Sequence, residues 1–279
     1  TLCIVVYYTI LIRNLNILVW NPIFILYTPI HYSNILSNLL FTKKKIQFMK
    51  KKTFAVDIDG TITENGGGRI HLDALESLRR LTNMGHDVIY VTGRSSVEAY
   101  LLSVFGGTKK IAVGENGGCI AFDADDHMLL GNIEECNRAY DLIKNSIDNV
   151  QKKPVFPRLT EVVLERTFEL DYARKILSEH NLDVNLSDSQ YAIHINSRGI
   201  DKGTGFTELM KKFNILKDDV IAIGDSATDV PLFKVAKTSI ALGNASDLVR
   251  SEATMTVSAS SGDGVLEALD KLAPKFSEI

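Results

Sequence analysis

The chain has 279 residues, 45% of them hydrophobic, so it can bury a core large enough for one large domain or two smaller ones. Residues 1–48 hold four of the 31 Lys and Arg and none of the 34 Asp and Glu, so residues 49–279 carry a net charge of −7 and no nucleic acid is expected as a partner. Cys3, Cys119 and Cys136 show neither CxxC spacing nor a histidine cluster nearby, so no disulfide framework or zinc site is indicated and a reducing cytoplasm fits best.

The first 48 residues differ in composition from the rest, because they contain no Asp, Glu or Gly. Apolar runs at 2–12 and 17–30 are followed by lysines at 43–45, which would suit a membrane anchor, but neither run reaches the roughly 18 residues of a spanning helix. A signal peptide would need a charged start and a small-residue cleavage site, and neither is evident in this segment. We interpret Met49 as the true start, with residues 1–48 outside the fold and no membrane partner; a weak anchor or a disordered tail is the alternative.

Apolar strands alternate with amphipathic helices in the segment that begins at residue 52. Alternation of this kind predicts a parallel sheet that is covered by helices. The expected order is a strand at 53–58, a helix at 72–81 that ends before Gly85, a strand at 88–91, a helix at 97–105 and a strand at 111–113.

The rhythm changes after residue 118. Turn-forming residues at 123–126 predict a hairpin, and strands joined by hairpins and backed by two helices describe a small α+β domain inserted at 119–197. Its expected elements are strands at 119–122 and 127–130, a helix at 133–150, a strand at 159–164, a helix at 170–180, and strands at 184–186 and 191–195.

Strand and helix alternation resumes after residue 198. We therefore expect an α/β fold with a Rossmann-like parallel-sheet core, made of residues 49–118 and 198–279, and a small α+β insertion. The expected elements are a helix at 202–213, a strand at 220–223, a helix at 230–236, a strand at 239–242 and a helix at 265–272.

Three of the core strands end in polar residues that are suited to catalysis. Ligands of open parallel sheets bind outside the carboxyl ends of the strands, so these loops should share one crevice. Four carboxylates in one crevice repel each other, and Mg²⁺ would relieve the repulsion while it accepts a phosphate oxygen. The residues are Asp57, Asp59, Gly60, Thr92, Gly93, Asp225 and Asp229, and Lys202 opens the helix at which the core resumes.

The order of DxDGT at 57–61, TGR at 92–94, Lys202 and GDxxxD at 224–229 resembles the haloacid dehalogenase superfamily of phosphohydrolases. Each motif alone could equally be an ordinary turn, a helix cap or a solvated residue, and the specificity lies in the ordered set. The resemblance extends over residues 52–276. The insertion resembles the cap of the family's Cof-type branch, and the compact core with a short cap most resembles the archaeal phosphoglycolate phosphatases.

The resemblance implies a role for each aspartate of the first motif. Asp57 would attack phosphorus and form an aspartyl-phosphate. Asp59 would protonate the leaving alkoxide and later deprotonate the hydrolytic water. The dehalogenases of the family lack this second aspartate, so its presence favours phosphate chemistry.

The same resemblance implies a metal site and a phosphate site. The metal would be Mg²⁺, and Thr92, Gly93 and Lys202 would bind the phosphoryl oxygens. The implied metal ligands are Asp57, the backbone carbonyl of Asp59, Asp225 and Asp229.

The expected activity is Mg²⁺-dependent hydrolysis of a small phosphorylated metabolite, 2-phosphoglycolate giving glycolate and phosphate. A sugar-phosphate or other Cof-type phosphatase is the alternative. Arg158, Arg166 and Arg198 lie in or near the insertion and are candidates to bind a substrate carboxylate. A response-regulator receiver would be shorter and order its motifs differently, and a binding protein on a decayed scaffold would lack residues that are present here. A homodimer through the cap is possible, although no long apolar stripe demands one.

Overall fold

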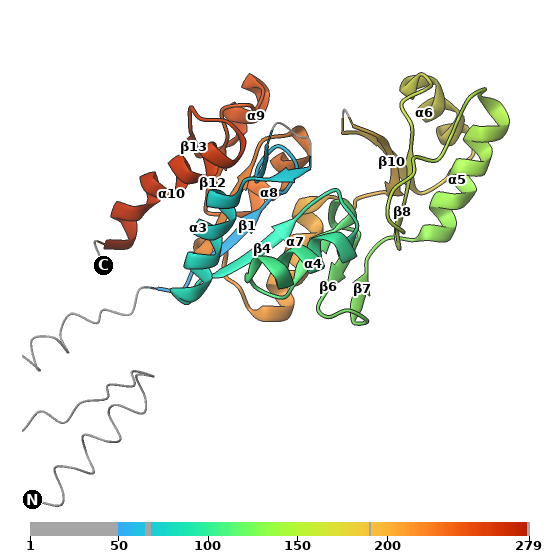
Figure 1. The fold of residues 1–279 in the computed structure, drawn as a ribbon. Helices are drawn as coiled ribbons and strands as arrows, with labels where there is room; N and C mark the ends of the chain where they lie inside the picture. Colours follow the sequence, from blue (N-terminus) through green and yellow to red (C-terminus); the bar gives the residue numbers. More distant parts are fainter. Residues whose placement is uncertain (1–49, 65–67, 190, 278–279) are drawn as a thin grey trace, which may run out of the picture. The chain divides into compact units, whose positions relative to one another are not determined.

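The computed structural model describes residues 50–64, 68–189 and 191–277 (Figure 1). The predictions for residues 1–48 concern a part of the chain outside this range. Within the described ranges, no helix combines the length and the apolar character that a bilayer crossing would require.

The core is built on an eight-stranded sheet with the strand order β13-β12-β11-β1-β4-β5-β6-β7. Pairing is parallel from β13 through β5, so the expected α/β class with a mainly parallel sheet is confirmed. The central strand β1 (Thr53–Val56) lies between β11 (Val220–Gly224) and β4 (Asp87–Val91). The other strands are β5 (Ala112–Gly114), β6 (Cys119–Ala121), β7 (His127–Leu129), β12 (Thr238–Ala241) and β13 (Met255–Thr256).

Helices cover both faces of this sheet because both faces of its central strands are apolar. Side chains alternate between faces along a strand, so Phe54 and Val56 enter one hydrophobic cluster and Ala55 enters the other. The cluster around Phe54 includes residues of α3 (Leu72–Asn83), α4 (Ser96–Gly106) and α10 (Ser261–Ser277), and α3 and α10 lie side by side (Figure 1). The cluster around Ala55 includes residues of α7 (Lys202–Phe213), α8 (Val230–Val235) and α9 (Asp247–Glu252).

The hairpin of β6 and β7 belongs to this large sheet, and not to the insertion as we expected. Strand β6 pairs antiparallel with β5, from Ala112 opposite Ala121 to Gly114 opposite Cys119. All three residues of β6 are buried, so the strand extends the core. A hairpin pattern indicates two paired strands, but it does not tell which sheet the pair joins. The limit of 119 for the inserted domain is therefore too early.

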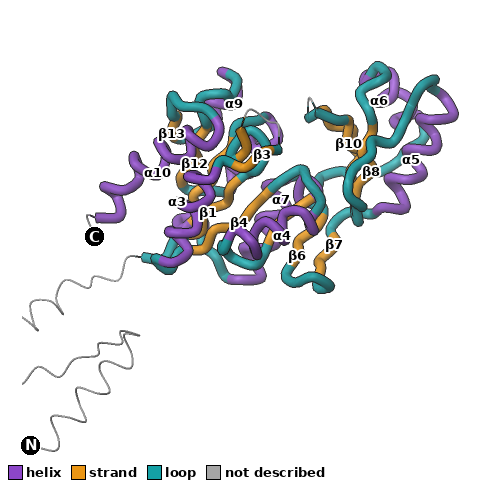
Figure 2. The backbone as a smooth tube through the Cα atoms, in the orientation of Figure 1, coloured by secondary structure: helices purple, strands orange, loops and turns teal. Residues whose placement is uncertain are grey.

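A second, three-stranded sheet forms the centre of the inserted segment (Figure 2). Its strands run antiparallel in the order β8-β10-β9, and two helices share their apolar cluster. The α+β character of the insertion is confirmed. The elements are α5 (Ile133–Ser146), β8 (Glu161–Leu164), α6 (Leu170–Glu179), β9 (Val184–Asp188) and β10 (Ile193–Ser197).

Short elements escaped the sequence analysis. The helix α9 has six residues, and β13 and the paired strands β2 (Thr63–Glu64) and β3 (Arg69–Ile70) have two residues each. Helical and strand periodicity needs longer windows than these segments offer.

The buried carboxylate of Glu115 ties the end of β5 to the segment that precedes β8. It accepts hydrogen bonds from the backbone N–H of Leu159 at 3.0 Å, and from the N–H and hydroxyl of Thr160, both at 2.7 Å. Burial raises the pKa of Glu115, and these hydrogen bonds oppose that shift. Glu115 and the next residue, Asn116, both have positive φ angles of 54° and 52°, so this junction is a sharp left-handed turn.

Candidate active site

The first motif, at 57–61, and the fourth, at 224–229, meet because their strands are neighbours. Strands β1 and β11 run parallel with Val56 opposite Ile223, so Asp57 and Asp225 both follow the carboxyl ends of adjacent strands. The backbone N–H of Asp57 extends the pairing by donating to the carbonyl of Ile223 at 3.0 Å. These loops lie at the edge of the sheet where ligands of such folds bind.

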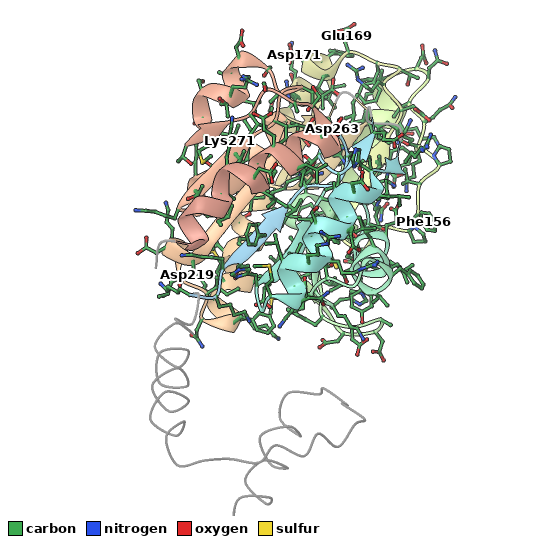
Figure 3. All side chains as sticks on the ribbon, turned by 60° about the vertical axis from the view of Figure 1, so that its left-hand side comes forward. Phe156, Glu169, Asp171, Asp219, Asp263 and Lys271 are labelled. Carbon is green, nitrogen blue, oxygen red and sulfur yellow. The ribbon has the colours of Figure 1, made fainter. Side chains whose placement is uncertain are left out.

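Three carboxylates converge at this edge. Asp57, Asp225 and Asp229 each offer one oxygen, and these oxygens lie within 4.8 Å of one another. The carboxylates of Asp171 and Asp263 face solvent, with 94% and 74% of the side chain exposed (Figure 3), whereas that of Asp57 is 4% exposed. Such a donor set fits a hard divalent cation.

Burial and mutual repulsion make this cluster unfavourable for negative charge. Burial raises the pKa of Asp57, and the charges of Asp229 and Asp225 raise it further while Lys202 lowers it. Burial likewise raises the pKa of Asp225 to about 6, with Asp229 adding to the shift. Both shifts show that the site favours a positive charge among these oxygens.

Lys202 supplies one positive charge from the first position of α7. Its Nζ donates to Oδ1 of Asp57 and to Oδ1 of Asp229, both at 2.7 Å. Burial alone would lower the pKa of Lys202, but the charges of Asp229 and Asp57 outweigh it and raise the pKa. The helix begins at this residue because Asp201 and Thr204 form a capping box, in which Oδ1 of Asp201 accepts from the Thr204 N–H at 2.7 Å.

Asp229 is fixed by its own loop. Its Oδ2 accepts hydrogen bonds from the N–H of Asp225 at 3.1 Å and from the N–H and hydroxyl of Ser226 at 2.9 and 3.0 Å. With Oδ1 on Lys202, both oxygens are engaged. Asp229 is therefore suited to orient both its own loop and Lys202. It also lies close enough to Asp57 and Asp225 to share a cation with them.

Gly60 allows the two acidic loops to approach closely. Its φ of +80° is a left-handed conformation, and a Cβ at this position would collide with the carboxylate of Asp225. The next residue, Thr61, donates its hydroxyl to Oδ1 of Asp225 at 2.9 Å. The Gly-Thr pair after the aspartates thus joins the first loop to the third.

Replacing Gly60 with Ala is expected to lower kcat/KM by at least about tenfold, because the new methyl group displaces the carboxylate of Asp225. Gly85→Ala is a matched control, since Gly85 also has a positive φ, +96°, but a Cβ there would meet nothing within 4 Å. Steady-state kinetics of the two variants separate the collision from the backbone strain. Equal activity in both variants would show that the Gly60 contact is unimportant.

The side chain of Asp59 pairs with an arginine instead of joining the other three aspartates. Its carboxylate forms a two-pronged ion pair with Arg94, whose Nε and Nη2 donate at 2.7 Å each. Hydrogen bonding to Asp59 raises the pKa of Arg94, and Nη1 of Arg94 is held by Glu98 at 3.0 Å. The side chain of Asp59 is therefore not part of the group of carboxylates that could hold a cation, although its backbone lies between Asp57 and Gly60.

The second motif lies beside the first, because β4 pairs with β1 and Tyr90 is opposite Val56. Thr92 is buried, and its hydroxyl accepts a hydrogen bond from the N–H of Arg94 at 3.1 Å. The carbonyl of Gly93 accepts a hydrogen bond at 2.6 Å from Arg158 of the inserted segment. The structure thus brings Thr92 and Gly93 to the same edge as Asp57.

Asn244 is a site residue that the sequence analysis missed. Its Nδ2 donates to Oδ2 of Asp225 at 2.8 Å and to the carbonyl of Gly60 at 2.9 Å. The signal was present, because Asn244 follows β12, and β12 is the next parallel strand beyond β11. A polar residue just after a buried parallel strand deserved the same weight as the recognised motifs.

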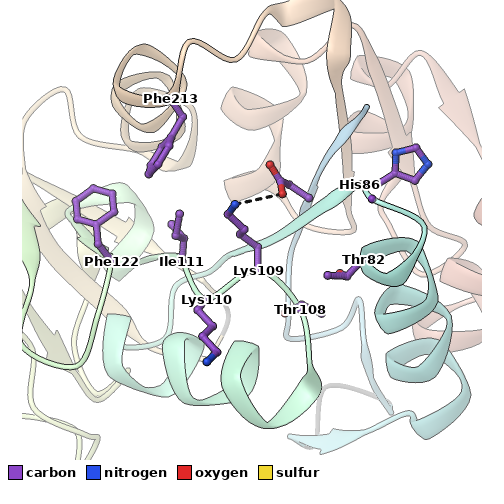
Figure 4. Close-up of a pocket in the computed structure, with 10 residues that line it drawn as sticks. Thr82, His86, Thr108, Lys109, Lys110, Ile111, Phe122 and Phe213 are labelled. Atoms are coloured by element: carbon purple, nitrogen blue, oxygen red, sulfur yellow. Dashed lines mark ion pairs between the residues drawn. The ribbon is translucent and has the colours of Figure 1, made fainter. Parts of the chain in front are cut away.

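A cavity of about 550 Å³ lies elsewhere and contains none of the predicted site residues (Figure 4). Its lining includes His86, Asp87, Lys109 and Phe213, and Lys109 is paired with Asp87 at 3.4 Å. Asp87 begins β4, opposite Thr53 at the start of β1. The cavity is therefore at the amino ends of the strands, away from the carboxylate cluster.

Comparisons with known proteins agree with this geometry. A family profile described as haloacid dehalogenase-like hydrolase matches residues 54–145 and 132–269. A phosphoglycolate phosphatase of Nitrosopumilus maritimus is 80% identical over 231 residues, which are 83% of this chain and all of that protein. A phosphoglycolate phosphatase of Methanosarcina mazei is 35% identical, covering 80% of this chain and 97% of that one.

Solved structures share the fold. The crystal structure of a Thermoplasma acidophilum protein superposes with a TM-score of 0.72 at 23% identity, covering 80% of this chain and 98% of that one. That of a haloacid dehalogenase-like hydrolase from Bacteroides thetaiotaomicron gives a TM-score of 0.65 at 20% identity, covering 80% and 100%. At these identities the likeness concerns the fold alone.

Proposed function

Because this chain belongs to the haloacid dehalogenase-like hydrolases and is a phosphatase, we propose that it uses Mg²⁺ to hydrolyse 2-phosphoglycolate to glycolate and phosphate. The observation that carries the proposal is the convergence of Asp57, Asp225 and Asp229 at the carboxyl edge of the sheet, with Lys202 paired to Asp57 and Asp229. The substrate is supported by the relative of 80% identity, which is named a phosphoglycolate phosphatase.

The residues present fit Mg²⁺. Three carboxylates of which two have raised pKa values form an oxygen-only donor set, which is the kind that Mg²⁺ prefers. We assign Asp57, the backbone carbonyl of Asp59 and Asp225 as ligands, with Asp229 as a ligand or orienting group. When bound, Mg²⁺ supplies Lewis-acid stabilisation of a phosphoryl group.

Asp57 is the proposed nucleophile. One of its carboxylate oxygens forms a bond to phosphorus while the bond between phosphorus and the glycolate oxygen breaks, which gives an aspartyl-phosphate. Lys202 holds Oδ1 of Asp57 at 2.7 Å and so limits rotation of the carboxylate. Thr92 and Lys202, with the backbone of Gly93, neutralise charge on the transferring oxygens.

Asp59 is the proposed acid and base. In the first step it gives a proton to the leaving glycolate oxygen, and in the second it takes a proton from the water that attacks the aspartyl-phosphate. The two hydrogen bonds from Arg94 fix the orientation of the Asp59 carboxylate.

The proposed compartment is the cytoplasm. Cys119 and Cys136 are buried free thiols, which a reducing compartment preserves. Burial raises the pKa of Cys119 to about 11 and that of Cys136 to about 12, so both thiols stay protonated and act as small apolar side chains.

Removing divalent cations is expected to lower the rate of phosphate release at least about a hundredfold, and added Mg²⁺ should restore it, because the carboxylates then lose their counter-charge. A panel of phosphate esters, assayed with and without chelator, makes the measurement.

The same panel tests the substrate. We expect kcat/KM for 2-phosphoglycolate to exceed that for bulky sugar phosphates at least about tenfold. Comparable rates on both kinds of ester would defeat the proposed substrate, and a rate indifferent to chelator would defeat the metal.

A further inference from the structure

We propose that Arg158 binds the carboxylate of the substrate and thereby selects small phosphate esters that carry one. This inference rests on the proposed function and adds the residue that sets its specificity. Three arginines of the inserted segment are candidates by sequence, and the structure separates Arg158 from Arg166 and Arg198.

The other two arginines lie on the surface. The side chain of Arg166 is 49% exposed and pairs with Asp188, and that of Arg198 is 66% exposed and pairs with Asp183. The side chain of Arg158 is 9% exposed. Because a buried guanidinium interacts more strongly with an anion than a solvated one does, Arg158 is the better carboxylate ligand of the three.

Arg158 reaches the loop that carries the phosphate-binding motif. Its Nη1 donates to the carbonyl of Gly93 at 2.6 Å, which places the guanidinium one residue from Thr92. Arg94, which follows Gly93 in the chain, forms the ion pair with Asp59. In 2-phosphoglycolate a single methylene separates the ester oxygen from the carboxylate. A group that binds this carboxylate must therefore lie beside the same loop, as Arg158 does.

The guanidinium keeps donors for a ligand. Among the described residues its hydrogen bonds, to Gly93 and to Oε1 of Glu161 at 2.8 Å, are both made by Nη1. Its Nε is buried and has no hydrogen-bond partner there. Buried polar groups are normally paired, so an unpaired donor in this position indicates a missing acceptor. A carboxylate matches the planar fork of donors that arginine presents.

Glu161 orients the guanidinium of Arg158, and it stays in place when the substrate binds. It is fully buried, and while Oε1 accepts from Arg158, Oε2 lies 3.1 Å from Nδ1 of His194 and 3.4 Å from Nδ2 of Asn116. Three polar partners thus anchor one carboxylate. Phe156, two residues before Arg158, is by contrast 62% exposed at the surface (Figure 3).

The test compares Arg158→Gln with the wild-type full chain on 2-phosphoglycolate and on p-nitrophenyl phosphate, which has no carboxylate. We expect KM for 2-phosphoglycolate to rise about a hundredfold with little change in kcat, and both constants for p-nitrophenyl phosphate to stay within about threefold. Arg158→Lys keeps the positive charge and loses the planar pair of donors. Its KM for 2-phosphoglycolate should therefore lie between those of wild type and Arg158→Gln. Arg166→Gln is the matched control and should behave as wild type on both substrates.

Each other outcome overturns the assignment. An equal loss on both substrates would make Arg158 a structural tie between the segments, and an unchanged KM for 2-phosphoglycolate would remove it from the site. If Arg158→Gln fails to fold, the ratio of the two kcat/KM values in Arg158→Lys decides, and an unchanged ratio refutes the inference. Failure of the proposed substrate is distinguishable, because wild-type protein would then hydrolyse p-nitrophenyl phosphate but not 2-phosphoglycolate.

Discussion

Replacing Asp57 with Asn is expected to lower kcat by about four orders of magnitude or more, because the amide cannot attack phosphorus. The fold should persist. Burial raises the pKa of Asp57, so the site already disfavours its negative charge, and a neutral amide of the same shape relieves repulsion from Asp225 and Asp229. The measurement is phosphate release under saturating substrate, together with a thermal unfolding curve.

Asp125→Asn provides the matched control, because Asp125 is exposed in the turn between β6 and β7. This variant should keep the wild-type kcat. An Asp57→Asn protein that folds and retains more than about a tenth of the wild-type kcat would remove Asp57 from its assigned role.

Replacing Lys202 with Met is expected to affect both stability and activity. The substitution leaves Asp57 and Asp229 buried without their shared cation, which destabilises the fold by about 3–5 kcal/mol. For a domain of this size that corresponds to a fall in Tm of about 10 °C. Activity should fall at least about a hundredfold, because a charge on the transferring phosphoryl group goes uncompensated. Thermal unfolding in the presence of chelator isolates the lysine from any metal.

Lys211→Met is the control on the same helix, since the side chain of Lys211 is 67% exposed and pairs with Glu208, which is itself 41% exposed. Its Tm should stay within about 2 °C of wild type. In the double variant Asp57→Asn/Lys202→Met one buried carboxylate is gone, so its Tm should lie above that of Lys202→Met alone. A double variant that is less stable still would contradict this view of the charge balance.

The meeting of Asp57, Asp225 and Thr92 could be predicted from the sequence because it depends only on backbone geometry. Each follows a short apolar strand, and parallel neighbours present their carboxyl ends at one edge. No side-chain detail is needed for that conclusion. The order of the strands was not predicted, and the expectation of one shared crevice rested on the alternation of strands and helices and on the resemblance to a known family.

The partners of individual side chains could not be predicted in the same way. Arg94 is part of the second motif, yet nothing in the order of residues indicates that its guanidinium faces Asp59 and Glu98. Likewise the hydrogen bonds from Asn244 to Asp225 and Gly60 join residues that are far apart in the chain. Such contacts depend on side-chain direction, which strand and helix periodicity leaves open.

The hairpin at β6 and β7 shows the limit for the fold itself. Its pattern identified two paired strands correctly, but the partner of β6 is set by β5 and by the burial of Cys119, Ile120 and Ala121. Membership of a sheet is a long-range property, so a local pattern could place the hairpin on either side of the junction at Glu115. The hairpin joins the large sheet because the edge of β5 would otherwise be unpaired.

The central claim is that Asp57 carries the phosphoryl group between the two steps, and trapping this intermediate tests it most directly. In Asp59→Asn the second step lacks its base, whereas p-nitrophenyl phosphate needs no acid in the first, so the aspartyl-phosphate should accumulate. Borohydride reduces an acyl phosphate to an alcohol, which turns aspartate into homoserine. Peptide mass spectrometry is predicted to find homoserine at position 57 only when substrate and Mg²⁺ are both present. Homoserine at position 225 or 229, or unmodified Asp57 under conditions of turnover, would contradict it.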